Sequence, residues 1–230
     1  MKKTCFLFLF LFFGTHAHSQ ILISLLFGDK LNSPNLEFGI DGGISWSEIS
    51  SLESSDQRGG LNLGFYFDIR IKNNFWLNTG LMLKSAQGLN NLTDGDLVTI
   101  GATPHESSGD YGQELSYWYL PVLAKYKFEN RIHLELGPQL GLIRNANVRF
   151  ESSDGNLTTL IEEDNVDHLN RFDVGVVGGV SYRLLKDMGM SIGVRYYYGF
   201  IDIYERVSGT TNSHIYLHAE IPIGAKEISQ

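Results

Sequence analysis

Apolar and polar side chains alternate with a period of two along most of the chain. In residues 61–71 one face carries only Leu, Phe and Ile, and the other carries Asn, Gly, Tyr, Asp and Arg. A helix would scatter these residues around its circumference, whereas a strand sorts them onto two faces. The same sorting predicts eight strands: 36–46, 61–71, 75–85, 117–128, 132–143, 172–184, 190–200 and 214–223.

The connections between these strands alternate in length. Three are short: 72–74, 129–131 and 185–189. Four are longer and rich in Ser, Asp, Asn and Gly: 48–59, 88–114, 145–170 and 201–213. Short periplasmic turns that alternate with long outer loops are typical of outer-membrane barrels. The strands exceed the five or six residues usual in soluble sheets and suit a tilted membrane crossing. We therefore predict an all-β, eight-stranded antiparallel up-and-down transmembrane barrel with both termini in the periplasm.

The N-terminus has the pattern of a secretory signal peptide. Lys2 and Lys3 precede the apolar run 5–13, and the small residues Ala17 and Ser19 fit a cleavage site before Gln20. A membrane anchor is the alternative, but about nine apolar residues are too few to cross a hydrocarbon core of about 30 Å. The predicted organisation is a signal peptide (1–19), a periplasmic lead-in (20–34), a barrel (35–223) and a C-terminal tail (224–230).

Composition narrows the chemistry of the mature chain. Cys5 is the only cysteine, and it lies in the predicted signal peptide, so the mature chain has no disulfide and no cysteine metal site. The chain has 18 Lys and Arg, two of them in the signal peptide, and 26 Asp and Glu. The remaining 16 basic and 26 acidic residues give the mature chain a net charge of −10. Nucleic acid is excluded as a partner, because the sequence has no basic patch that could hold a phosphate backbone. No later segment has 18 consecutive apolar residues, which excludes helical membrane spans.

The orientation of the two strand faces separates a membrane barrel from a soluble, lipocalin-like carrier. A soluble barrel would turn its apolar face inward, and a membrane barrel would turn it toward lipid. Two features favour the membrane barrel. Aromatic residues such as Trp46, Trp118 and Phe200 lie near predicted strand ends, where an interfacial girdle would form. Glycines recur on the polar face, where inside a narrow barrel they would make room for long Arg and Lys side chains.

The polar face carries equal numbers of acidic and basic residues. An eight-stranded barrel is about wide enough for side chains to fill its interior, and unpaired buried charges cost several kcal/mol. We therefore predict a structural ion network in a polar, side-chain-filled lumen, and no conducting pore. The predicted members are Glu37, Asp41, Asp68, Arg70, Lys84, Lys125, Lys127, Glu135, Asp173, Arg183, Arg195 and Glu220.

Several stretches together carry a family resemblance: 36–39 with 41–43, 119–126, 136–141 (Leu-Gly-Pro-Gln-Leu-Gly), 172–175 with 178–179, and 195–200. In their order and spacing they resemble the PorT-type outer-membrane β-barrel family of Gram-negative bacteria. The resemblance covers about residues 35–223 and implies a small barrel located in the outer membrane. The chain departs from many outer-membrane barrels at its C-terminus, which continues past Ile223 instead of ending on an aromatic residue. The family is named after a member associated with type IX secretion and gliding, and we do not transfer that role.

Catalytic and metal-binding patterns are weak. His133 and Glu135 share one inward face, but no serine is tied to them by spacing. His214 and His218 also share a face, although four residues of a strand separate them by about 13 Å. The acidic residues of 145–170, among them Glu162, Glu163 and Asp164, could attract calcium, but a solvated loop is the favoured explanation. We predict no cofactor, no metal and no enzymatic activity.

Three classes of function remain open on this sequence. The favoured class is a structural or interaction barrel, monomeric, surrounded by outer-membrane lipid and lipopolysaccharide, with envelope protein partners contacting loops 88–114 and 145–170. The second is an accessory component of a secretion or envelope-assembly system. The third is a lipid-modifying enzyme. The segment 21–31 does not alternate and has no assigned role.

Overall fold

The computed structural model describes residues 33–154, 157–184 and 189–223. The predicted signal peptide, most of the predicted lead-in and the predicted tail 224–230 lie outside the described residues. These boundaries stay predictions.

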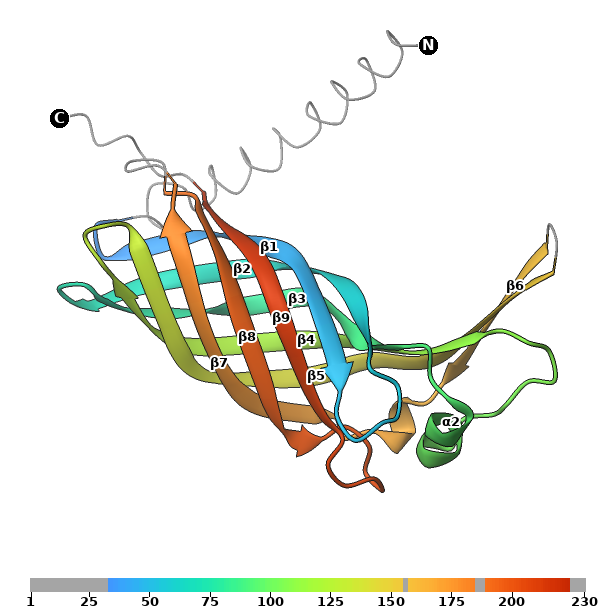
Figure 1. Ribbon diagram of the computed structural model, residues 1–230. Coiled ribbons are helices and arrows are strands. Elements are labelled where there is room, and N and C mark those ends of the chain that lie inside the picture. The colour runs from blue at the N-terminus through green and yellow to red at the C-terminus, as the bar shows by residue number, and fades with distance from the viewer. Residues whose placement is uncertain (1–32, 155–156, 185–188, 224–230) are drawn as a thin grey trace, which may run out of the picture.

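The described chain consists almost entirely of antiparallel strands (Figure 1). The elements are β1 (Leu36–Ile49), β2 (Asp56–Lys72), β3 (Phe75–Asn90), α2 (Asp94–Ile100), β4 (Asp110–Lys127), β5 (Ile132–Asp154), β6 (Leu157–Asp164), the 3-10 turn η1 (Val166–His168), β7 (Phe172–Arg183), β8 (Ser191–Asp202) and β9 (Thr211–Pro222).

Eight of these strands close into a ring. Each pairs antiparallel with its neighbours in the order β4-β3-β2-β1-β9-β8-β7-β5, and β4 pairs with β5 to complete the circle. The predicted up-and-down barrel is therefore confirmed, and closure leaves the ring without a free edge. The start of β1 and the end of β9 lie at one end, because Gly39 pairs with Pro222. The short connections 73–74 and 128–131 lie at this same end, which we call the turn end; the opposite end is the loop end.

The eight predicted strands are all present, but several continue beyond their predicted limits at the loop end. β4 begins at Asp110 instead of residue 117, and β2 begins at Asp56 instead of residue 61. Most residues in these added segments are polar on either face of the strand. The alternation of apolar and polar residues therefore gave little signal for them. The barrel wall formed by β2 to β5 is consequently taller than the rest of the ring, as Figure 1 shows.

The segment 145–170 was wrongly predicted to be only a loop. β5 pairs with β7 as far as Leu142, continues to Asp154, and remains paired with β4 as far as Glu151. β6 returns along it from Leu157 to Asp164. We call the hairpin of residues 145–164 the arm. It projects away from the ring (Figure 1), and within the described residues β6 pairs only with β5.

The segment 88–114 likewise contains structure that alternation could not reveal. α2 begins with a capping box, in which the hydroxyl of Thr93 accepts from the Asp96 amide and the Asp96 carboxylate accepts from the Thr93 amide. It ends at Gly101, whose φ of 72° lies in the left-handed region that favours glycine. Leu97 and Ile100 of α2 are buried against the loop end of the barrel.

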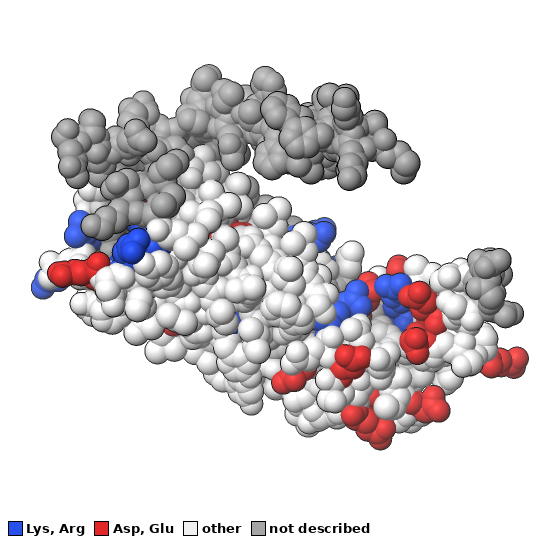
Figure 2. All heavy atoms as spheres, turned by 45° about the horizontal axis from the view of Figure 1, so that its top comes forward, with Lys and Arg blue, Asp and Glu red and all other residues white. Residues whose placement is uncertain are grey.

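The outer wall of the ring is apolar. Figure 2 shows a largely white surface, with charged residues gathered toward the two ends. The exposed apolar side chains include Leu63, Leu120, Leu136, Val194 and Leu217, and they come from the face predicted to point toward lipid. Within the described residues no helix is long and apolar enough to span a membrane.

Candidate functional site

Lys125 lies inside the barrel near the turn end and is completely buried. Its Nζ lies 3.1 Å from Asp68, 2.9 Å from Glu135 and 2.6 Å from Glu220. These three carboxylates come from β2, β5 and β9, whereas Lys125 comes from β4. One ammonium therefore links four strands across the lumen.

Arg195 of β8 makes a second set of links at the same level. Its guanidinium lies 2.7 Å from Asp41, 2.6 Å from Glu135 and 2.8 Å from Glu220. Glu135 and Glu220 thus each contact both cations. The planar guanidinium can donate five hydrogen bonds in a fixed geometry, which suits it to hold three carboxylates at once.

The network continues toward the turn end through less buried pairs. Lys127 lies 2.6 Å from Asp68 and contacts the ring of Trp76, 4.0 Å from its centroid. Arg183 lies 2.5 Å from Glu37, which also accepts from the hydroxyl of Tyr66. Ion pairs in this part of the barrel are partly solvated, so each contributes less than the central ones.

We call this set the ion network, and it connects every strand of the ring except β3 by ion pairs. Asn78 of β3 completes the circle, because its amide donates to Asp68 at 2.7 Å and to Glu220 at 3.2 Å. The charged members are Glu37, Asp41, Asp68, Lys125, Lys127, Glu135, Arg183, Arg195 and Glu220.

Three of the twelve residues predicted for this network lie elsewhere. Arg70 is exposed at the turn end, beyond the last level of interior side chains, where it donates to the Asn73 carbonyl. Lys84 is exposed on the outer face because a register irregularity in β3, between Met82 and Ser85, reverses the alternation. Asp173 is buried inside the barrel, but within the described residues no Lys or Arg contacts it. Its inclusion in an ion network was therefore wrong.

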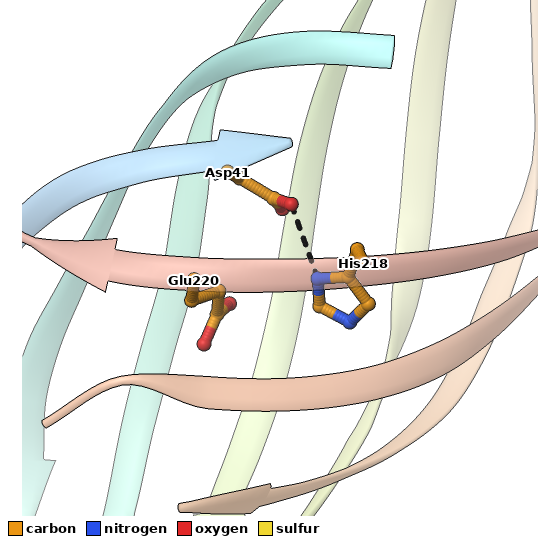
Figure 3. Close-up of side chains that lie close together, drawn as sticks. All are labelled: Asp41, His218 and Glu220. Carbon is orange, nitrogen blue, oxygen red and sulfur yellow. Dashed lines mark hydrogen bonds and ion pairs between the residues drawn. The ribbon is translucent and has the colours of Figure 1, made fainter. Parts of the chain in front are cut away.

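His218 was missed by the sequence reasoning as a neighbour of this network. Its Nδ1 lies 3.1 Å from Oδ1 of Asp41 (Figure 3), whereas Arg195 contacts the other carboxylate oxygen of Asp41. The charged members of the network among the described residues are five carboxylates and four Lys and Arg side chains. No spacing signal could have identified the pair, because Asp41 and His218 are 177 residues apart.

Asp41, His218 and Glu220 lie close enough to hold a metal ion, since one ligand atom of each is within 4.8 Å of the others (Figure 3). Their other contacts argue against this use. Both carboxylates already pair with Arg195, and Glu220 also pairs with Lys125. A metal ion would add a third positive centre beside a guanidinium and an ammonium. The donor set therefore fits an internal ion network better than a metal centre.

The loop half of the interior is aromatic. Tyr117 and Tyr119 stack with ring centroids 5.0 Å apart, and Tyr197 lies 5.6 Å from Tyr119. The ring of His214 stacks on Tyr197 at 5.0 Å. Asp173 lies at the edge of this group, with the Tyr119 hydroxyl donating to it at 3.5 Å. The predicted polar lumen is thus correct for the turn half, whereas tyrosine rings fill the loop half.

A layer of loop residues covers the tyrosines. Gln113 and Asn165 exchange two amide hydrogen bonds of 3.2 and 2.8 Å, and Tyr204 donates to Gln113 at 2.8 Å. Burial, and to a smaller degree the Asp96 carboxylate, raises the pKa of Tyr204, which keeps its hydroxyl protonated as a donor. Leu97 packs into the same layer. We call this layer the cap.

The residues considered for catalysis do not assemble into a nucleophile and base. Glu135 is held by Lys125 and Arg195, so it does not orient His133. His214 packs among tyrosines, and His218 contacts Asp41. Within the described residues these histidines serve the interior packing and the ion network.

The acidic residue Glu163 accepts hydrogen bonds from the backbone N–H and the hydroxyl of Thr103. This contact links the arm to the segment before β4.

The closed antiparallel ring, its apolar outer wall and its charged interior define a membrane-spanning β-barrel. A family model described as outer membrane protein beta-barrel domain matches residues 28–205. The chain belongs to this family, and its location is the outer membrane. In barrels of this class the short turns face the periplasm and the longer loops face outward.

Solved structures with a similar arrangement share little sequence with the chain. One is Ail, the attachment invasion locus protein of Yersinia pestis, solved in complex with the heparin analogue sucrose octasulfate. It is 10% identical to this chain with a TM-score of 0.46, and the match covers 82% of this chain and 99% of Ail. Neisserial surface protein A is 13% identical with a TM-score of 0.40, and the match covers 81% of this chain and 96% of that protein. OprG of Pseudomonas aeruginosa is 12% identical with a TM-score of 0.34, and the match covers 82% of this chain and 93% of OprG. No curated protein matches the sequence significantly.

Proposed function

We propose that this protein is a non-conducting, non-enzymatic outer-membrane barrel that anchors a protein-interaction surface at its loop end. The filled interior supports the first part. The ion network crosses the turn half, the tyrosines fill the loop half, and the cap lies above them. A solute crossing the membrane through the lumen would have to displace all three layers. Because the network is held by buried ion pairs, opening it would cost several kcal/mol.

Conductance measurements test the absence of a pore. We expect purified full-length protein, refolded and inserted in planar lipid bilayers, to show no large, stable conductance steps, since no layer of the interior leaves an open path. Insertion is verified separately by heat-modifiable mobility on gels and by protease protection of the same vesicles. Porin-like steps in preparations that pass both checks would overturn the proposal.

The interaction surface is supported by apolar side chains that are exposed beyond the lipid-facing wall. Val98 of α2 is 78% exposed, and Leu160 and Ile161 of β6 are 50% and 38% exposed. Because consecutive strand residues point to opposite faces, β6 presents one apolar side chain on each face, and a partner could bury either of them. β6 also offers an unpaired strand edge within the described residues, and such edges can accept a strand from a partner. These features lie in the two segments predicted to contact envelope proteins.

Site-specific photo-crosslinking in intact cells tests this surface. We expect a photoreactive amino acid at Leu160 to give a discrete protein adduct, because this side chain is exposed and lies on the arm. The matched control is Leu136, which is also exposed but faces lipid on the ring, and which should give no protein adduct. The absence of an adduct from Leu160, or the same adduct from both positions, would contradict an arm-specific contact.

We also propose that the chain is a PorT-type member of the family, on the order and spacing of its motifs. The most specific of these, residues 136–141, lies in β5 with Gly137, Gln139 and Gly141 on the inward face. The proposal does not include a role in secretion.

A further inference from the structure

A polar pocket lies on the outward face of the tall wall formed by β2 to β5. Its volume is about 200 Å³, and its lining includes Arg58, Asn90, Asp110, Gly112 and Arg149. It includes Arg149 and Glu151 of the arm, but no charged member of the ion network lines it, and neither do Leu160 and Ile161. Figure 2 shows acidic and basic side chains side by side at this end of the molecule.

The pocket lies above the lipid-facing wall. Trp118 is the last large apolar residue of β4 on the outward face, and Arg144 packs over its ring at 4.8 Å. Gly112 is six residues further along the same strand face, which corresponds to about 20 Å along the strand. Strands in these barrels are tilted by about 35–45°, so the pocket stands clear of the hydrocarbon core, at the height of lipid headgroups and attached sugars.

The polar groups of the pocket are held in place by their neighbours. Glu114 accepts from Arg58 at 2.7 Å and contacts Arg149 at 3.5 Å. Arg149 also pairs with Glu151 at 2.5 Å, and Arg58 donates to Asn90 at 3.3 Å. The buried Nε of Arg149 has no hydrogen-bond partner within the described residues. The side chains of the site are therefore held by one another, and a ligand that binds groups already in place gains affinity because binding does not have to order the protein.

The charge of the lining selects against an anionic ligand. Three carboxylates, those of Asp56, Asp110 and Glu151, line the pocket against two guanidinium groups. A phosphate or sulfate would meet a net negative surface. A hydroxyl group, in contrast, can donate to a carboxylate and accept from a guanidinium or an amide at the same time. The volume is below the 300–1,000 Å³ of drug-sized sites, so the ligand is small.

The backbone at Gly112 makes room for this ligand. A Cβ added at Gly112 would make one tight contact, at 3.3 Å with the Leu89 carbonyl oxygen, and would otherwise meet Asn90 at ordinary distances of 3.8 and 3.9 Å. Any larger side chain would extend into the open pocket. The glycine thus keeps the pocket empty of protein atoms.

We propose that this pocket binds one uncharged sugar ring of a saccharide at the cell surface. The inference rests on the outward orientation of the loop end, but it does not depend on the absence of conductance or on the arm contact. The sugar could belong to the core of lipopolysaccharide or to a free saccharide, since both present the same hydroxyl chemistry.

Saturation-transfer NMR on the full-length protein tests the site. The protein is placed in lipid nanodiscs, because sugar-based detergents would compete, and is titrated with uncharged methyl glycosides of common hexoses and heptoses. We expect at least one glycoside to bind. We expect Gly112→Leu, which fills the pocket, to weaken binding by tenfold or more. The matched control is Gly178→Leu on the lipid-facing wall, where an added Cβ meets only Leu136 at 3.9 Å, and it should bind as the unaltered protein does.

A second variant guards against misfolding of the first. Asp110→Ala removes an exposed lining carboxylate that forms no ion pair among the described residues, and it should also weaken binding. Nanodiscs that contain lipopolysaccharide with or without its core sugars distinguish the two sources of the sugar. If the glycoside binds more weakly only when the core is complete, lipopolysaccharide is the occupant. If the glycoside binds equally in both kinds of nanodisc, the ligand is a free saccharide. Absence of binding by every uncharged glycoside, unchanged binding by both variants, or stronger competition by sugar phosphates would overturn the proposal.

Discussion

Replacement of Lys125 by methionine is expected to destabilise the barrel by about 3–5 kcal/mol, the cost of removing one partner from a buried ionic contact. Asp68, Glu135 and Glu220 would lose their shared ammonium, and the remaining guanidinium of Arg195 reaches only two of them. Methionine keeps nearly the same length and volume, so the effect isolates the charge. Urea unfolding in lipid vesicles, followed by tryptophan fluorescence, measures the change.

Lys84→Met is the matched control for this experiment. Lys84 belongs to the same set of residues that alternation predicts to be interior, yet it is exposed on the outer face of β3. Its replacement should change the free energy of unfolding by less than about 0.5 kcal/mol. Equal effects of the two substitutions would contradict the ion network as a source of stability.

A compensating substitution sharpens the same prediction. Adding Glu220→Gln to Lys125→Met removes one of the carboxylates left without its partner, while the amide can still bond to Asn78 and Arg195. The double variant should therefore be more stable than Lys125→Met alone, which a double-mutant cycle reports as a favourable coupling energy. A purely additive result would show that the two side chains do not interact through charge.

The sequence allowed the ring to be predicted because lipid imposes a simple rule on it. Every residue of a ring strand faces either hydrocarbon or the lumen, so hydrophobicity must alternate wherever the strand lies in the membrane. That rule ends at the membrane surface. The extensions of β2 and β4, and the arm, have water on one or both faces, and their strand structure depends on pairing between neighbours. Hydrophobic period carries no signal for such segments.

The interior was predicted less accurately than the wall. Nine of the charged residues that alternation assigned to the lumen form ion pairs with one another there, since a charge on the inward face of a narrow barrel must meet another. It failed at Lys84, because one register irregularity reverses every later position of a strand. It also failed at Asp173, because the sequence gives no information on the height of a residue within the lumen. Asp173 lies at the level of the tyrosines, away from the cations.

The inward glycines show a further difference between expectation and structure. They were expected to make room for Arg and Lys side chains, and Gly179 does so, since a Cβ there would lie 2.8 Å from Cγ of Arg195. At Gly141, however, the neighbour is the ring of Tyr119, 2.6 Å from the position of an added Cβ. Gly141 and Tyr119 are thus paired on adjacent strands in the aromatic half. In this arrangement the tyrosine ring packs over the backbone of the glycine, which has no side chain of its own to cover it.

Gly141→Ala is therefore expected to destabilise the barrel by about 1–3 kcal/mol, the usual cost of overpacking a well-packed core. The Tyr119 ring cannot move freely, because it stacks on Tyr117 and its hydroxyl accepts from Asn212 at 2.9 Å. The same substitution at Gly178, which faces outward, should have the opposite sign. Alanine is preferred to glycine in a strand by about 0.5–1 kcal/mol, and the added methyl meets only the end of Leu136.

The two glycine variants can be compared in one urea-unfolding experiment in vesicles, since both leave the charge of the protein unchanged. Tyr119→Leu combined with Gly141→Ala provides the decisive cycle. If the ring is what the methyl group displaces, the alanine should cost less once the ring is absent, and the coupling energy should be favourable. Equal destabilisation by alanine at Gly141 and Gly178, or a cost at Gly141 that persists without the ring, would show that backbone strain at Gly141, and not the tyrosine packing, requires glycine.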